Sequence, residues 1–305
     1  MGKKENPLLA YYNQEERFAQ LMNGWLFRGK PYLKASDISE ADRRQEGKGG
    51  KGREYRHRYR DLYKKLDNAI VRLYVGTEPM EYVDYAMPLR VMDSDTLSYL
   101  HQKKAISKEY MGKQGLEADE YLSRFSKGDR LLPVITLVLY CGDRPWDGAR
   151  RLHEMLELEK LPGELKEYVE DYAIHILDVC HTPDERLQEF PPEICFLLMC
   201  IKYANDKEAL LRLKELTGCS DISEDTMETL GEYLDMPELL ENRDTIEGGR
   251  IKMRNNGFRE LIEDGRKEGI EWAKQIFKLE KEGLSAKEIA ERLAVSEEQI
   301  KKVLE

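Results

Sequence analysis

The sequence predicts an α/β protein, with a small mixed sheet flanked by helices, then an all-helical region and a C-terminal helical tail. A continuously apolar run from Leu131 to Tyr140 is typical of an interior strand that is covered on both faces. A second apolar, β-branched run spans Ala69 to Val75. Segments with helical spacing of apolar residues lie before, between and after these runs. The chain of 305 residues is long enough to bury a large core.

The first elements follow from local patterns. A helix is expected from Asn13, whose spacing to Glu16 resembles a capping box, to Arg28, where Gly29 ends it. Its apolar face would consist of Phe18, Leu21, Met22, Trp25 and Leu26. The glycine-rich stretch 46–52 is expected to be a loop. Strands should follow over residues 55–66 and 69–75, and a helix reaching about Lys104 should face the sheet with Leu89, Met92, Leu97 and Leu100.

The second half of the chain is predicted to be helical. A turn at residues 141–148 should lead to helices from Arg151 onward, and we divide the chain into an α/β core (1–160), a helical extension (161–240) and a charged linker with a helical tail (241–305). In the tail, Ser285 with Glu288 and Ser296 with Gln299 form two successive capping boxes, which indicate a helix-turn-helix outline. Acidic residues begin its second helix, so packing or homo-oligomer formation is an alternative to DNA reading.

Composition limits the compartment and the partners. The net charge is −10, and no run of eighteen apolar residues is present, so we expect a protein without a membrane partner. The N-terminus lacks the apolar core of a secretion signal. The five cysteines are odd in number and form no CxxC pair, which favours free thiols in a reducing compartment. Together these features predict a cytoplasmic protein.

One basic segment stands out against the acidic average. Between Arg43 and Lys65 there are ten basic and three acidic residues, a local charge of +7, with tyrosines interleaved. Such a segment suits a phosphate backbone, so DNA is the predicted partner. The alternative is a glycine-rich loop that happens to be basic. The predicted DNA-contacting residues are Arg53, Arg56, Arg58, Arg60, Lys64 and Lys65.

Two acidic residues could bind a metal beside this basic segment. Asp61 lies within the first expected strand, and Glu78 follows the second. Two strands that each bring a carboxylate to one edge of a sheet can hold Mg²⁺, which needs only one or two protein carboxylates. The alternative is that both are solvated acids, because 35% of the residues are charged.

Several motifs together resemble one family. They are Arg60-Asp61-Leu62, Glu78 after an apolar strand, Asp84-Tyr85-Ala86-Met87-Pro88-Leu89-Arg90, the segment from Gly128 to Gly142, and Pro145-Trp146-Asp147-Gly148. The sequence from about Gln14 to Leu240 resembles the Rpn recombination-promoting nucleases, also called putative transposases, of the PD-(D/E)XK superfamily. The resemblance implies a restriction-endonuclease-like core and DNA cleavage that depends on Mg²⁺ (or Mn²⁺). It also implies a bacterial role in recombination, mobile elements or phage defence.

The resemblance assigns roles to individual positions. Asp61 matches the metal-binding aspartate and Glu78 the acid of the Glu-x-Gln motif, while the backbone carbonyl of Pro79 could be a further metal ligand. The sequence departs from the family at Met80, where a Gln or Lys is expected, because a thioether can neither orient water nor stabilise phosphoryl charge. Lys64, Lys103 or Lys104 could substitute. The chain is then either a weakened Mg²⁺-dependent DNA endonuclease, or a catalytically degenerate fold that acts as a nucleic-acid- or protein-binding regulatory module.

Overall fold

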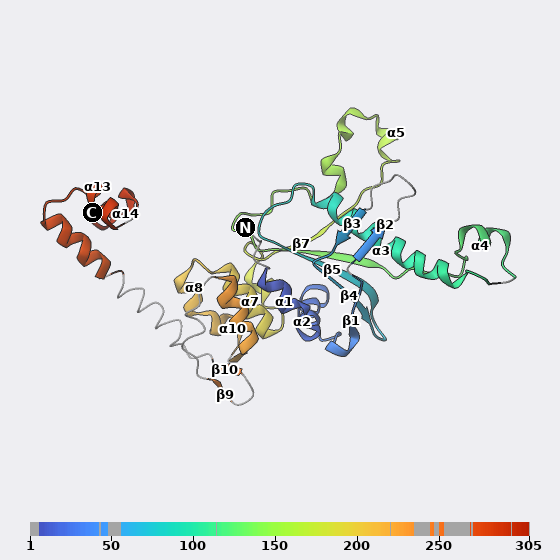
Figure 1. The fold of residues 1–305 in the computed structure, drawn as a ribbon, viewed down its shortest axis with the longest axis horizontal. Helices are drawn as coiled ribbons and strands as arrows, with labels where there is room; N and C mark the ends of the chain where they lie inside the picture. The colour runs from blue at the N-terminus through green and yellow to red at the C-terminus, as the bar shows by residue number, and fades with distance from the viewer. Residues whose placement is uncertain are drawn as a thin grey trace.

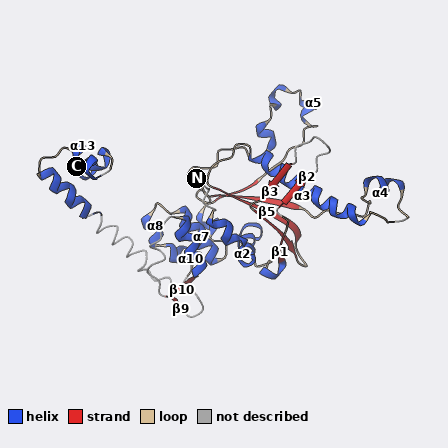
Figure 2. Ribbon diagram, viewed as in Figure 1, coloured by secondary structure: helices blue, strands red, loops and turns tan. Residues whose placement is uncertain are grey.

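A mixed five-stranded sheet forms the centre of the molecule, with helices on both faces (Figures 1 and 2). The computed structural model describes residues 6–42, 44–47, 56–113, 115–219, 221–234, 245–246, 250–252, 269, 271–293 and 295–304. The sheet order is β1-β4-β5-β6-β7. The strands are β1 (Ile38–Glu40), β4 (Leu62–Asp67), β5 (Arg72–Met80), β6 (Val134–Tyr140) and β7 (His175–Asp178).

The type of strand pairing changes once across the sheet. β1, β4 and β5 are joined by antiparallel pairs, whereas β5, β6 and β7 run parallel to one another. The connection from β5 to β6 passes through the long helix α3 (Met87–Glu109), which contacts β6. Parallel neighbours require such a crossover. The predicted mixed α/β fold with flanking helices is therefore confirmed, and the Leu131–Tyr140 run does supply an interior strand.

The larger core lies on the sheet face that is covered by the N-terminal helices and by helices from the second half of the chain. Alternate strand residues point into it, including Val75 from β5 and Leu137 and Leu139 from β6. The helices packed there include α1 (Pro7–Asn13), α2 (Glu15–Phe27), α7 (Pro192–Lys202) and α10 (Glu224–Tyr233). α7 is almost wholly apolar and has nine buried residues, as expected for a helix inside a core.

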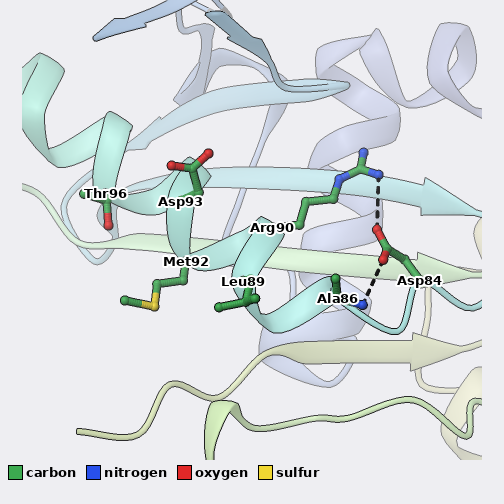
Figure 3. A pocket seen from close by; sticks show the side chains of 7 residues that line it. All are labelled: Asp84, Ala86, Leu89, Arg90, Met92, Asp93 and Thr96. Atoms are coloured by element: carbon green, nitrogen blue, oxygen red, sulfur yellow. Dashed lines mark hydrogen bonds and ion pairs between the residues drawn. The ribbon is translucent and has the colours of Figure 1, made fainter. Parts of the chain in front are cut away.

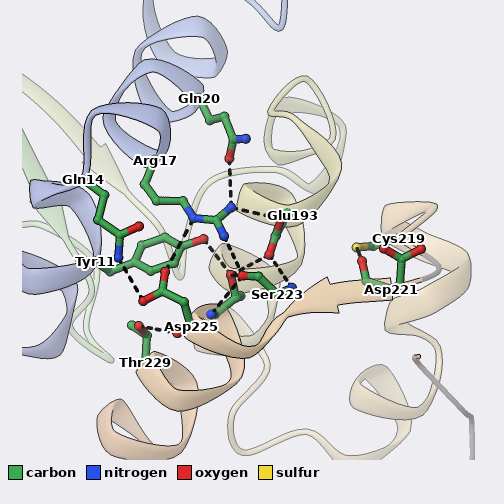
Figure 4. A network of polar contacts seen from close by, with 11 residues as sticks. Tyr11, Gln14, Arg17, Gln20, Glu193, Cys219, Asp221, Ser223, Asp225 and Thr229 are labelled. Carbon is green, nitrogen blue, oxygen red and sulfur yellow. Dashed lines mark hydrogen bonds and ion pairs between the residues drawn. The ribbon is translucent and has the colours of Figure 1, made fainter. Parts of the chain in front are cut away.

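A buried polar network joins these helices (Figure 4). Arg17 of α2 lies 3.0 Å from a carboxylate oxygen of Glu193 on α7, and it also donates a hydrogen bond to the Ser223 hydroxyl. Glu193 accepts hydrogen bonds of 2.7 Å from the Ser223 N–H and the Thr226 hydroxyl. These charge-assisted hydrogen bonds join α2, which precedes the strands of the sheet in the chain, to α7 and the start of α10, which follow them.

The other face of the sheet is covered by α3 and has a smaller apolar cluster. Met87 and Val91 of α3 pack there with Met80, Val138 and Tyr140 of the sheet. Further along α3, small or polar residues face the sheet instead, because Ser94, Asp95 and Ser98 are all buried. Beyond the sheet, α3 continues outward, and α4 (Ala118–Ser123) lies near its far end (Figure 1).

Most of the remaining elements are short. Two small sheets lie apart from the central one: β2 (Arg44–Gly47) pairs with β3 (Arg56–Tyr59), and β8 (Asp221–Ser223), β10 (Arg250–Lys252) and β9 (Thr245–Ile246) form a three-stranded sheet. The short helices are α5 (Gly163–Lys166), α6 (Asp184–Leu187), α8 (Lys207–Leu211) and α9 (Leu213–Thr217), and 3₁₀ turns occur at Ala35–Asp37, Leu152–Met155 and Leu158–Lys160.

The C-terminal unit has its own apolar cluster. It consists of helix 271–281, α13 (Ala286–Leu293) and α14 (Glu297–Leu304). The Ser285–Glu288 capping box is present there, which confirms part of the predicted outline.

Several expected elements differ from the structure. The strand predicted over 55–66 is two strands that are interrupted at Arg60 and Asp61, and the strand predicted over 69–75 is shifted to Arg72–Met80, leaving Ile70 exposed. The segment from residue 161 contains β7 as well as helices, and the chain after Arg151 forms 3₁₀ turns. The Asn13 cap is absent because Asn13 ends α1 and Gln14 precedes α2.

The orientation of α3 was also predicted incorrectly. Three of its expected sheet-facing residues are exposed, namely Leu89, Met92 and Leu100, and only Leu97 is buried. The helix turns its Ser94, Asp95 and Ser98 face inward because that face meets a buried arginine, as described below. Hydrophobic spacing alone could not reveal a polar interior.

Candidate metal and nucleic-acid site

Asp61 and Glu78 lie side by side at one end of β4 and β5. The antiparallel ladder between these strands begins with Leu62 opposite Thr77, so Asp61 just precedes it on one strand and Glu78 just follows it on the other. The negative charge of Asp61 is among the causes that raise the pKa of Glu78, which also indicates proximity. The structure therefore brings together the two carboxylates that were predicted to bind a metal.

Glu78 is a buried acid with one strong cationic partner. Its side chain is 4% exposed, and its Oε2 accepts a hydrogen bond of 2.6 Å from Nη2 of Arg90 in the first turn of α3. Burial raises the pKa of Glu78 above its usual value, and the charge of Asp61 raises it further, while Arg90 and Arg60 act in the opposite direction. A cation at this position would favour the charged carboxylate.

Met80 lies on the same face of β5 as Glu78, because side chains two residues apart on a strand point the same way. It is 4% exposed and belongs to the apolar cluster with Val91, Val138 and Tyr140. A thioether is a poor ligand for a hard cation. Met80 therefore supplies packing at the position where the resemblance had led us to expect Gln or Lys.

The donor set fits a cation that keeps much of its hydration. Mg²⁺ requires only one or two protein carboxylates, which Asp61 and Glu78 can provide. The carbonyl of Pro79, the residue after Glu78, could add one oxygen. Pro79 lies beyond the end of the β4–β5 ladder, and it has no N–H to donate. Among the described residues, no group of three His, Cys, Asp or Glu side chains is arranged to hold a metal ion. Asp61 and Glu78 thus fit a two-carboxylate site rather than a closed protein cage.

A buried arginine lies immediately beside this site. Arg60 is 2% exposed, and its guanidinium lies over Gly76, where any side chain would collide with it. Arg60 donates hydrogen bonds to Asp95 and, at 2.7 Å, to the Thr136 hydroxyl. Asp95 also accepts hydrogen bonds from Thr136 and Tyr172. Because Arg60 precedes Asp61 in the chain, this network fixes the backbone that carries the first carboxylate.

The structure separates the residues that were predicted to contact DNA. Arg60 is buried as described, and Lys64 is buried on the opposite face of β4, where its Nζ donates to the Asn13 carbonyl at 2.6 Å and to Glu40 at 2.5 Å. Both side chains are turned inward, which is a correction to their expected role. Lys65 is partly exposed and pairs with Asp67 at 2.5 Å.

The other predicted basic contacts lie on or beyond the β2–β3 hairpin. Arg56 and Arg58 are in β3, two positions apart, and β2 lies against α3. Arg53 lies outside the described residues. Of the lysines considered as substitutes for the motif position, Lys103 and Lys104 are exposed on the second half of α3, about 20 Å along the helix axis from Arg90. Neither lysine joins the carboxylate pair.

An open pocket of about 650 Å³ runs along the start of α3 (Figure 3). It is lined by Asp84, Ala86, Leu89, Arg90, Met92, Asp93 and Thr96. Asp84 accepts a hydrogen bond of 2.9 Å from the Ala86 N–H, and its Oδ2 lies 3.7 Å from Nη1 of Arg90. Arg90 thus connects the buried Glu78 to a solvent-accessible pocket.

Sequence reasoning missed the roles of Arg90 and Asp95. Arg90 lies twelve positions after Glu78. Its only signal in the sequence was a charge within the otherwise apolar first turn of a helix. Asp95 lies among polar residues and gave no comparable signal.

The fold and the site define a mixed α/β protein with two acidic side chains at one end of its central strands. Residues 116–229 match the model of a family described as "Putative transposase, YhgA-like". The resemblance expected from the sequence motifs is confirmed for this part of the chain. The match includes β6, β7, α7 and part of α10, while α1, α2, Asp61 and Glu78 lie before it. No curated protein and no solved structure matches the chain.

No helix in the described part of the chain has both the length and the apolar character needed to cross a membrane.

Proposed function

We propose that the protein is an Mg²⁺-dependent DNA endonuclease of the recombination-promoting type, with activity weakened by Met80. The observation that carries the proposal is the pairing of Asp61 and Glu78 at one end of adjacent strands, next to a basic segment. The match to a transposase family supports a nuclease-type function on DNA. Phosphodiester hydrolysis is the reaction that these groups suit best.

Each residue of the site would have a separate role in the reaction. Asp61 and Glu78 would hold the metal ion from two neighbouring strands, and the Pro79 carbonyl could add an oxygen. Mg²⁺ would lower the pKa of a bound water and balance charge on the phosphoryl group. The buried Arg60–Asp95 network would keep Asp61 in place. With Met80 in the motif, no side chain at that position orients the attacking water, so we expect slow turnover.

Nucleic-acid binding would depend mainly on the hairpin. Arg56 and Arg58 lie in β3, and Arg53 precedes them in the sequence, so a phosphate backbone held by this segment would pass beside α3 and the pocket at Arg90. Lys65 could add a contact. Basic contacts of this kind give binding that weakens steeply with salt.

A second candidate function follows from the packing of Met80. Its side chain fills an apolar cluster, so the motif position has been absorbed into the core. A fold of this kind could bind nucleic acid or a protein without turnover, as a regulatory module. It predicts tight, salt-dependent DNA binding with no cleavage by the wild-type protein.

Nicking of supercoiled plasmid DNA tests the proposal. Wild-type protein should nick the plasmid in Mg²⁺ and not in EDTA, and Asp61→Ala should lower the rate about a thousandfold, since a lost metal ligand removes several kcal/mol of transition-state stabilisation. Asp67→Ala is the matched control, because Asp67 is an exposed aspartate at the other end of β4. Nicking that persists in Asp61→Ala would overturn the proposal.

A further inference from the structure

Arg90 has the only guanidinium in the described structure that contacts Glu78 directly and also lines the open pocket. Its side chain is 25% exposed, whereas that of Glu78 is 4% exposed. It begins in the first turn of α3, so the backbone that carries it is fixed by the packing of Met87 and Val91 against the sheet. A positive group is therefore held between the buried Glu78 and the open pocket, where Figure 3 shows Arg90 beside Asp84.

The contacts of Arg90 leave it able to engage a further anion. A guanidinium has five N–H donors in a planar fork. The contact with Glu78 is a hydrogen bond of 2.6 Å, whereas the contact with Asp84 is an ion pair at 3.7 Å, beyond hydrogen-bond distance. A phosphate in the pocket could accept hydrogen bonds from the same fork.

Arg60 provides an internal comparison. Both arginines act electrostatically on Glu78, but the Arg60 side chain is fully buried and engaged by Asp95 and Thr136. Arg60 can stabilise the site only from the protein interior, whereas Arg90 lines the open pocket through which a ligand would reach the site. The two arginines therefore have separable roles.

We propose that Arg90 is a catalytic residue that binds the scissile phosphate of the nucleic acid and stabilises the negative charge that develops on it. This inference rests on the proposed nuclease function. Hydrolysis joins the oxygen of water to phosphorus and breaks the bond to the sugar oxygen, which takes a proton from that water, so no other reactant is needed. Arg90 supplies from α3 the charge stabilisation that Met80 cannot supply from β5.

Binding measured without metal separates this inference from the nuclease proposal. A short fluorescein-labelled DNA duplex is titrated in EDTA at a series of salt concentrations, so that no cleavage contributes. Loss of one phosphate contact should reduce the magnitude of the negative slope of log K against log salt by about 0.9. The comparison is Glu78→Gln with Glu78→Gln/Arg90→Ala, because removing Arg90 alone would leave a buried carboxylate unpaired.

Arg72→Ala in the Glu78→Gln background is the control, since Arg72 is an exposed arginine at the opposite end of β5. We expect the slope to become less steep with Arg90→Ala and to stay unchanged with Arg72→Ala. Equal slopes for Glu78→Gln and Glu78→Gln/Arg90→Ala would overturn the role of Arg90. Absence of DNA binding by the wild-type protein would overturn both proposals. Binding without metal-dependent cleavage would reject the nuclease function and, with it, the catalytic role, even where the slope shows a phosphate contact.

Discussion

The two faces of the central sheet differ in what they bury. The face toward α1, α2 and α7 encloses the large apolar core, in which Leu137 and Leu139 of β6 take part. The face toward α3 buries a small apolar cluster beside the charged residues Arg60, Asp95 and Glu78. The larger apolar cluster lies on the first face, and the buried, paired charges lie on the second.

This difference shows how one sheet can stabilise the fold on one face and carry the candidate site on the other. Side chains of neighbouring residues on a strand point to opposite faces, so Leu137 can stabilise the fold while Thr136 and Val138 shape the polar side. Burial of charge on the second face is unfavourable unless each charge has a partner. The pairs Arg60–Asp95 and Arg90–Glu78 meet that requirement.

The largest expected effect on stability comes from breaking the buried pair on the polar face. Asp95→Ala should lower the free energy of unfolding by about 3–5 kcal/mol, because it leaves Arg60 buried without its counter-charge. Chemical denaturation measures this loss. The double variant Arg60→Met/Asp95→Leu should recover most of it, and an equal loss in both variants would show that the ion pair is not the cause.

The apolar face should respond to loss of volume. Leu137→Ala should lower the free energy of unfolding by about 3 kcal/mol through the cavity it leaves, with cleavage per folded molecule unchanged. Val134→Ala, at the partly exposed start of the same strand, is the control. A smaller loss for Leu137→Ala than for the control would contradict the assignment of the main core.

A smaller effect is expected at the glycine that accommodates Arg60. A β-carbon at Gly76 would collide with the Arg60 guanidinium and crowd Thr136, so Gly76→Ala should cost about 1–3 kcal/mol of unfolding free energy. Gly163→Ala in α5 is the control, because an added β-carbon there meets no atom within 4 Å. If both variants are equally stable, Arg60 does not occupy the space above Gly76.

An effect that depends on pH is expected in the polar network on the apolar face. Burial acts to raise the pKa of Glu193, but hydrogen bonds from Ser223 and Thr226 and the contact with Arg17 outweigh it and lower the pKa to about 2. A folded-state pKa below the unfolded value contributes stability above the unfolded pKa, and this stability is lost as the pH falls toward 2. Glu193→Gln should therefore flatten the dependence of unfolding free energy on pH between about 2 and 5. An unchanged pH dependence would reject this contribution.

Much of the fold could be predicted from the sequence because its strongest signals are local. The apolar run at β6 and the first-helix pattern ending at Gly29 match the structure, since each depends on burial or backbone preference along one segment. β1 and β7 were missed because each is only three or four residues long and is defined by pairing with a distant strand.

The candidate site could be predicted only in part. Asp61 and Glu78 were proposed as a pair, and the strand register brings them together. Lys64 was assigned to DNA because its sequence neighbours are basic, but alternation along β4 turns it to the other face. Arg90 joins the site through the crossover from β5 to α3, a tertiary contact that no local pattern records.

The most direct test of the account is the single-turnover rate of DNA cleavage in Mg²⁺ for the wild type, Met80→Gln and Asp61→Ala/Met80→Gln. We expect Met80→Gln to cut on the order of tenfold or more faster than the wild type, because it restores a polar group beside Glu78. The double variant should lose this activity because Asp61 is required to hold the metal. Cleavage by the double variant at the rate of Met80→Gln would contradict the central claim that the Asp61–Glu78 pair is the catalytic metal site.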